Sequence, residues 1–220
     1  MIFHNAVAKC LYLSKRSRPD IQTAVAFLTT RVKEPDEDDW KKLQRLLGYL
    51  KGTAHLVLTL RDDGRGVMWW LDAAYSVHPD MRGHTGGTLS LGKGSVYSKS
   101  SKQKLNTTSS TEAELVGTYE CMLEILWTKY FLEAQGYETE QTIVYQDNKS
   151  TILLAKNGKN SSSKRTKHIN IRYFFIQDRW KRGEFDIQYC STDEMLADIF
   201  TKPLQGKKFV MFRNKVLGIE

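Results

Sequence analysis

Cysteine is scarce in this sequence, and long apolar runs are missing from it. The three cysteines, Cys10, Cys121 and Cys190, are scattered and form no CxxC pair, which excludes a zinc ribbon and a disulfide framework. No apolar run reaches the length of a membrane span, and the first 20 residues lack the long apolar core of a signal peptide. We therefore expect a protein of a reducing compartment, cytoplasmic or nuclear, with no membrane partner.

Basic residues outnumber acidic ones. The 220 residues include 33 Lys and Arg against 25 Asp and Glu, a net charge of +8, and the hydrophobic fraction of 40% is that of a globular protein. Such an excess suits a polyanionic partner, because neutralising phosphates releases counterions. A solvated basic surface has the same composition, so charge alone leaves nucleic-acid binding open.

The first 53 residues have the periodicity of helices. Apolar residues recur at helical spacing, and an acidic run after Pro35 is typical of a helix start. The apolar residues are Ile21, Val25, Leu28, Val32, Trp40, Leu43, Leu47 and Leu50. The sequence thus predicts a short all-helical segment that ends near residues 52–55.

From residue 55 onwards the pattern is that of alternating strands and helices. Two β-hairpins are expected first, one over residues 55–73 with its turn at Asp62-Asp63-Gly64, and one over residues 88–99. The following elements are a helix over 111–134, a strand over 142–146, a helix over 149–156, a helix around 169–180, a strand over 185–190 and a last helix from about 191. This order predicts a mixed α/β sheet flanked by helices.

Four carboxylates fall where such a sheet would gather them. Asp72 and Asp147 each close an apolar strand, Glu114 lies in the first turn of the long helix, and Asp198 lies in the first turns of the last one. Ligands collect outside the carboxyl ends of strands in open α/β sheets. Clustered carboxylates repel one another unless a hard cation such as magnesium binds them. Two such ions can activate a water and stabilise the leaving oxygen of a phosphodiester.

Each of these acids also has a purely structural interpretation. Glu112 and Glu114 both stand three residues after a Ser or Thr, as in a helix capping box. Asp147 fits a helix N-cap, and Asp72 fits a turn at a strand end. Only the joint placement of the four favours a metal site, so the spacing by itself leaves the choice open.

Five short motifs contain these acids or lie between them. In chain order they are Leu71-Asp72-Ala73-Ala74 with Gly86-Gly87, Ser109-Ser110-Thr111-Glu112-Ala113-Glu114, Gln146-Asp147-Asn148-Lys149-Ser150, Arg165-Thr166-Lys167-His168-Ile169 and Leu196-Ala197-Asp198-Ile199-Phe200-Thr201-Lys202-Pro203-Leu204. In order and approximate spacing they resemble the C-terminal part of Pol polyproteins from copia-type LTR retrotransposons. The resemblance covers nearly the whole chain.

The resemblance implies an RNase H-like domain across residues 55–204, followed by a C-terminal helical tail at 205–220. It also implies that residues 1–53 are the tail of a reverse transcriptase, its thumb and connection. The polymerase palm has no counterpart in this sequence, so we expect no polymerase activity from it. The palm, in the remainder of the Pol polyprotein, is an expected partner.

The resemblance also assigns the acids. Asp72, Asp147 and Asp198 match the first, third and last acids of an RNase H site. The glutamate is ambiguous between Glu112 and Glu114, and we choose Glu114 because an apolar helical run follows it directly. In the loop before Asp198 we find no histidine, although cellular RNases H often have one there.

The implied activity is an RNase H-type ribonuclease that cuts the RNA strand of RNA–DNA hybrids with two Mg²⁺ ions, for which Mn²⁺ may substitute, held by the four acids. A hybrid would be bound by its shape and its phosphates. The candidate contacts are Lys99, Lys102, Lys104, Lys164, Arg165, Lys167 and His168. The alternative is a catalytically silent remnant of a retroelement, or a module that only binds nucleic acid.

Overall fold

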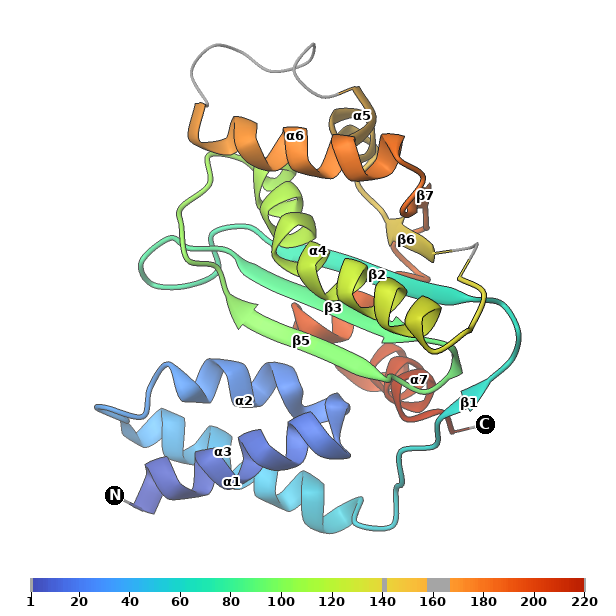
Figure 1. Cartoon of the computed structure of the whole chain (residues 1–220). Coiled ribbons are helices and arrows are strands. Elements are labelled where there is room, and N and C mark those ends of the chain that lie inside the picture. Colours follow the sequence, from blue (N-terminus) through green and yellow to red (C-terminus); the bar gives the residue numbers. More distant parts are fainter. Residues whose placement is uncertain (1, 140–141, 158–166, 220) are drawn as a thin grey trace.

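The computed structural model of this chain describes residues 2–139, 142–157 and 167–219 (Figure 1). Its N-terminal part is helical, as expected. The elements are α1 (Ile2–Arg16), the 3₁₀ helix η1 (Pro19–Ile21), α2 (Gln22–Thr29) and α3 (Glu37–Gly52). Among the described residues no helix is both long and apolar enough to span a bilayer.

Helix α3 begins at a capping box in which Asp36 and Asp39 each accept a hydrogen bond from the backbone N–H of the other. The acidic run therefore starts a helix, as predicted. The expected apolar stripe is only partly correct, because Leu47 is 45% exposed while Leu43 and Leu46 are buried against α1 and α2. These three helices thus share an apolar core of their own.

The centre of the molecule is a five-stranded sheet in the order β5-β3-β2-β6-β7. Strands β5, β3 and β2 are antiparallel, whereas β2, β6 and β7 run parallel. The bounds are β2 (Val67–Ala74), β3 (His84–Ser90), β5 (Tyr97–Lys102), β6 (Thr142–Gln146) and β7 (Asp186–Tyr189). The predicted mixed α/β sheet flanked by helices, after an all-helical segment, is confirmed.

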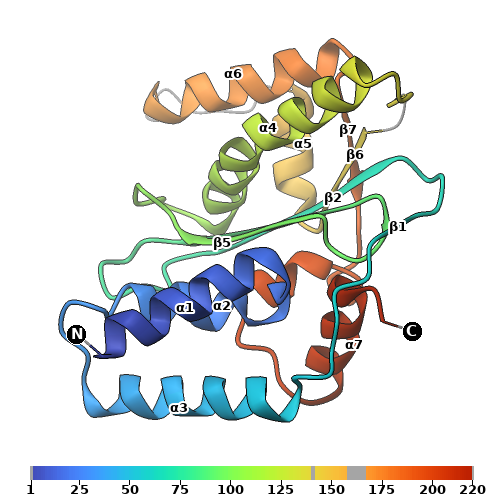
Figure 2. The same ribbon diagram turned by 60° about the horizontal axis from the view of Figure 1, so that its bottom comes forward.

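Helices cover both faces of this sheet (Figures 1 and 2). On one face lie α4 (Ser110–Ala134), α5 (Lys149–Asn157) and α6 (Lys167–Lys181). On the other face lie the N-terminal helices, the 3₁₀ helix η3 (Leu196–Phe200) and α7 (Gly206–Leu217). Successive residues of β2 supply both cores, because Trp69 is fully buried on the α4 side and Trp70 packs toward η3.

The first predicted hairpin is wrong. Strand β1 (Arg61–Asp62) pairs with β4 (Gly92–Lys93), and not with β2. Both edges of β2 are occupied by β3 and β6, so no edge remains for a local partner. Residues 55–60 form no strand and run beside α7, where the Thr59 N–H donates to the Leu217 carbonyl at 2.8 Å.

The predicted last helix is also different from the structure. Asp198 lies in η3, a 3₁₀ helix of five residues, rather than in the first turns of an α-helix. Pro203 follows shortly after, and a proline cannot continue a helix through its own nitrogen. The chain starts again as α7 at Gly206, so the tail expected at 205–220 is one helix that packs back against η3.

Close packing at β3 holds η3 against the sheet. A Cβ atom on Gly86 would stand 2.5 Å from Thr201 Cγ2 and 3.0 Å from Phe200 Cβ. Two hydroxyls fasten η3 from its other side: Thr23 of α2 donates to the Ile199 carbonyl at 2.5 Å, and Ser100 of β5 donates to the Phe200 carbonyl at 2.7 Å. The short helix is therefore fixed from both sides.

Candidate metal centre

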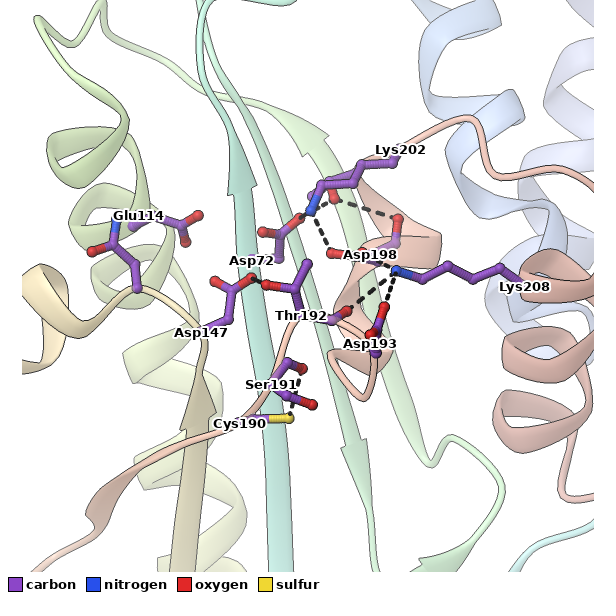
Figure 3. A network of polar contacts seen from close by, with 12 residues as sticks. Asp72, Glu114, Asp147, Cys190, Ser191, Thr192, Asp193, Asp198, Lys202 and Lys208 are labelled. Carbon is purple, nitrogen blue, oxygen red and sulfur yellow. Dashed lines mark hydrogen bonds and ion pairs between the residues drawn. The ribbon is translucent and has the colours of Figure 1, made fainter.

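Three of the four predicted acids meet at one edge of the sheet. Strands β2 and β6 are parallel neighbours with Trp70 opposite Tyr145, so the same register sets Asp72 level with Asp147. Asp198 reaches them from η3 (Figure 3). One carboxylate oxygen from each of the three lies within 4.8 Å of the others. Asp72 and Asp198 are buried, and Asp147 is half-buried.

Side chains from the C-terminal segment contact all three aspartates. Thr201 donates its hydroxyl to Asp72, and Thr192 donates to Asp147 Oδ2 at 3.1 Å. The larger set of contacts is made by two lysines. Lys202 Nζ lies 2.5 Å from Asp198 Oδ1 and 3.5 Å from Asp72 Oδ2, and Lys208 Nζ lies 3.2 Å from Asp198 Oδ2.

Sequence analysis did not single out these lysines or threonines as site residues. Asp198 and Lys202 are spaced as a helical i,i+4 ion pair, which is a weak signal because such pairs are usual on solvated surfaces. Lys208 lies ten residues after Asp198 and beyond a proline, so no local pattern connects the two. Only the return of α7 toward η3 brings it to the site.

Glu114 stands beside this group. Among the described residues, the three whose oxygens lie within 4.8 Å of one another do not include it. Its buried carboxylate points from α4 toward Asp72 and Asp147, and its Oε2 accepts a hydrogen bond from Gln146 Nε2 at 3.2 Å (Figure 3). Burial, then the charges of Asp72 and Asp147, raise the pKa of Glu114 well above its usual value.

The pKa of Asp72 is also raised, and burial is the main cause. The Lys202 ammonium and the Thr201 hydroxyl lower it in part, while the charges of Asp198 and Asp147 raise it further. The pKa of Lys202 is raised by the same two aspartates, although its own burial opposes the shift. The site thus holds more negative charge than its own cations neutralise.

Glu112, the other candidate for the glutamate, has a different environment. Its Oε2 accepts hydrogen bonds from the backbone N–H and the hydroxyl of Thr108, both at 2.7 Å. Its own backbone N–H donates to the Ser109 hydroxyl at 3.2 Å, which is the N-cap of α4. The structure therefore places Glu112 in the cap of the helix and Glu114 beside the aspartates.

The predicted nucleic-acid contacts are distributed over two regions. Lys99 of β5 donates to the Glu120 carbonyl at 2.8 Å, Lys102 pairs with Asp80 at 2.6 Å, and Lys104 is exposed in the loop that follows. Lys164 and Arg165 lie outside the described residues. Lys167 and His168 begin α6, and their side chains also lie outside the described part of the chain.

The donor set suits a hard divalent cation. Magnesium prefers a few carboxylate oxygens and keeps several waters, and this edge offers three converging carboxylates with a fourth beside them. Clustered acids without a cation repel one another, which the raised pKa values of Asp72 and Glu114 express. Over the described ranges, no second group of three or more metal-ligating side chains is found.

Comparisons with known proteins point in one direction. No family model matches the chain. It is 31% identical over 215 residues to the retrovirus-related Pol polyprotein from transposon TNT 1-94 of Nicotiana tabacum, which covers 97% of this chain and 16% of that protein. It is 32% identical over 203 residues to the corresponding polyprotein from transposon RE2 of Arabidopsis thaliana, over 91% of this chain and 14% of that protein.

The chain therefore spans less than a fifth of the length of these curated relatives. Among solved structures, one that resembles it is LC11-RNase H1 in complex with an RNA/DNA hybrid. The identity is 13% and the TM-score 0.44, over 61% of this chain and 92% of that one.

Proposed function

Because the chain belongs to the Pol polyproteins of copia-type LTR retrotransposons, we propose that it is a metal-dependent endonuclease that cleaves the RNA strand of RNA–DNA hybrids. The observation that supports the proposal most is the convergence of Asp72, Asp147 and Asp198 within 4.8 Å. A buried group of acids with so little compensating charge is unfavourable in itself, and such sites are where function is expected.

The residues that would hold the metal are Asp72, Asp147 and Asp198, with Glu114 as the fourth acid. Two Mg²⁺ ions, or Mn²⁺ in their place, would activate the attacking water and stabilise the leaving oxygen of the phosphodiester. The chain itself orients the ligands: Thr201 fixes the Asp72 carboxylate, Thr192 fixes Asp147, and Gln146 fixes Glu114. Burial of Asp72 and Asp198 excludes water from their side chains.

The substrate would lie along the basic residues beside this edge. Lys104 is exposed in the loop between β5 and α4, and Lys99 and Lys102 precede it on β5. Lys164, Arg165, Lys167 and His168 complete the proposed contact set. These groups suit phosphates, so binding would follow the shape of the hybrid rather than its sequence. The reverse transcriptase palm, elsewhere in the Pol polyprotein, would be the partner in the longer protein.

Cleavage of a labelled hybrid by the purified protein tests this proposal. We expect the RNA strand to be cut in Mg²⁺ or Mn²⁺ and to stay intact in EDTA, because the acids alone repel the substrate phosphates. Single-stranded RNA and DNA duplex serve as controls for substrate class. An Asp147→Asn variant, which has the shape of the original residue without its charge, is the control for a contaminating nuclease.

Two results would count against the proposal. A hybrid left intact in both metals, by protein that unfolds cooperatively on heating, would favour a silent remnant. Binding of the hybrid without cleavage would favour a nucleic-acid-binding module.

A further inference from the structure

An ammonium group lies within the carboxylate cluster. Lys202 Nζ is 2.5 Å from Asp198 Oδ1 and 3.5 Å from Asp72 Oδ2, between two of the three side chains proposed to bind metal (Figure 3). Magnesium binds carboxylate oxygens at about 2.0–2.1 Å. A cation held that closely by the same two aspartates would collide with the ammonium, so the two occupants exclude each other.

The position of Lys202 is built into the fold. The Lys202 backbone N–H donates to the Asp198 carbonyl at 2.9 Å, and the preceding Thr201 bonds Asp72. Its backbone is therefore fixed next to the acids, while its side chain remains 38% exposed. A flexible four-carbon stem with an open path to solvent can move its charge out of the site without any change of the backbone.

Lys208 offers a natural comparison. It also pairs with Asp198, but at the other oxygen, Oδ2, and its ammonium donates in addition to the Thr192 carbonyl at 3.2 Å. Among the described residues its carboxylate partners are Asp198 and the exposed Asp193. Lys208 thus neutralises the rim of the cluster, whereas Lys202 bridges two of its members.

We propose that Lys202 is a tethered counter-cation that occupies the Asp72–Asp198 pair while metal is absent and is displaced when a divalent cation binds. Buried like charges need a partner, and Lys202 supplies one in the metal-free protein. Its displacement subtracts from the binding free energy of the metal, so Lys202 sets the metal concentration at which the site fills. The inference rests on the proposed function only in taking the aspartates as a metal site.

Metal binding by the whole chain, without nucleic acid, tests this. We would titrate Mg²⁺ and Mn²⁺ by calorimetry into the original protein and into Lys202→Met, which keeps the length of the side chain and removes its charge. The expected result is at least tenfold tighter binding by Lys202→Met, with a lower melting temperature in EDTA, because the acids lose their counter-cation. Lys202→Arg keeps the charge and should bind metal within about threefold of the original protein.

Lys208→Met is the matched control, because it removes one charge from the same aspartate without touching the Asp72–Asp198 pair. A smaller gain in affinity than for Lys202→Met supports displacement. An equal gain would overturn it, because general electrostatics would then explain both. Unchanged affinity in Lys202→Met would overturn it directly.

A measurement on the unmodified sequence covers a Lys202→Met protein that fails to fold. Lysines labelled by ¹³C-dimethylation can be followed by NMR, with Lys202→Arg to assign the signal. The Lys202 signal should move as Mg²⁺ is added, and a signal that stays fixed while metal binds would overturn the inference. Tighter metal binding by Lys202→Met in a protein that cuts no hybrid would support the inference and sink the proposed ribonuclease. No metal binding by any of the proteins would overturn both.

Discussion

Two buried ionic clusters in this molecule have opposite characters. The first joins the N-terminal helices. Arg18 donates two hydrogen bonds to Asp20, at 2.9 and 2.8 Å, and one to the Thr53 carbonyl at 3.1 Å, while Tyr49 donates to Asp20 at 2.6 Å. One guanidinium thus meets one carboxylate in a bidentate pair, and both oxygens of Asp20 have partners. Burial and Asp20 raise the pKa of Tyr49 to about 12, so this phenol stays a donor.

The second cluster is the acidic one, and it is unbalanced. Asp72, Asp147, Asp198 and Glu114 share the ammonium groups of two lysines, and burial raises the pKa of Asp72 and of Glu114. Burial is common to both clusters, so burial alone does not separate a structural ion pair from a functional site. The surplus of one charge does, because a fold gains nothing from holding it unless a ligand completes it.

Replacing an acid of the second cluster should have the largest effect. In Asp72→Asn the cation loses a ligand worth several kcal/mol in the transition state, so we expect hybrid cleavage to fall roughly 100- to 1000-fold. The metal-free protein should keep its stability or gain some, because a buried charge is removed. Cleavage rates beside thermal unfolding in EDTA check both. A variant that loses its fold along with its activity would show that Asp72 is structural.

The matching change in the first cluster should affect stability instead. Arg18→Met leaves Asp20 buried without its cation, which should lower the free energy of unfolding by about 3 kcal/mol. Cleavage per folded molecule should stay within about twofold of the original. Urea denaturation measures the first quantity and hybrid cleavage the second. The double change Arg18→Met with Asp20→Leu should restore most of the stability, and no recovery would contradict the account of a balanced pair.

The smallest effects separate the two glutamates of α4. Glu112→Gln weakens the helix cap and should lower stability by about 1 kcal/mol or less, with little loss of cleavage. Glu114→Gln should abolish most cleavage while stabilising the metal-free protein. The reverse pattern of activity would show that the assigned glutamate is off by two residues.

The pH dependence of stability sharpens this comparison. A raised folded-state pKa means that Glu114 favours folding while it is protonated, and that this contribution is lost as the pH rises through the raised pKa. Melting temperatures in EDTA should therefore coincide for the original protein and Glu114→Gln near pH 4 and diverge at higher pH, with the variant more stable. A gap that closes as the pH rises would contradict the assignment.

Local sequence predicted the elements whose pattern is self-contained. The strand Thr142–Gln146 and the helix that starts at Lys149 have the expected bounds, because an apolar run followed by a turn signals both. The β1 pairing could not be predicted in this way, because Arg61–Asp62 finds its partner 30 residues further along the chain. Local rules favour the nearest strand, and here that strand already has two neighbours.

The candidate site was predictable only in part for the same reason. Asp72 and Asp147 end adjacent parallel strands, so strand geometry alone places them together. The roles of Lys202 and Lys208 depend on how η3 and α7 fold back over the sheet, which no spacing in the sequence states. The distinction between Glu112 and Glu114 depends on which face of α4 meets the sheet, and both fit a capping pattern.

The bond from Thr23 to the Ile199 carbonyl connects parts of the chain 176 residues apart. A fragment cut where the periodicity changes, near residue 55, would contain every acid of the site. It would also leave that carbonyl without its donor and strip α2 from the strand β5 on which it packs. The shortest stretch that contains the chemistry is therefore shorter than the shortest stretch that holds its shape, and a rearrangement that separated the two would transmit the residues of the site without the support of the helix that bears Asp198.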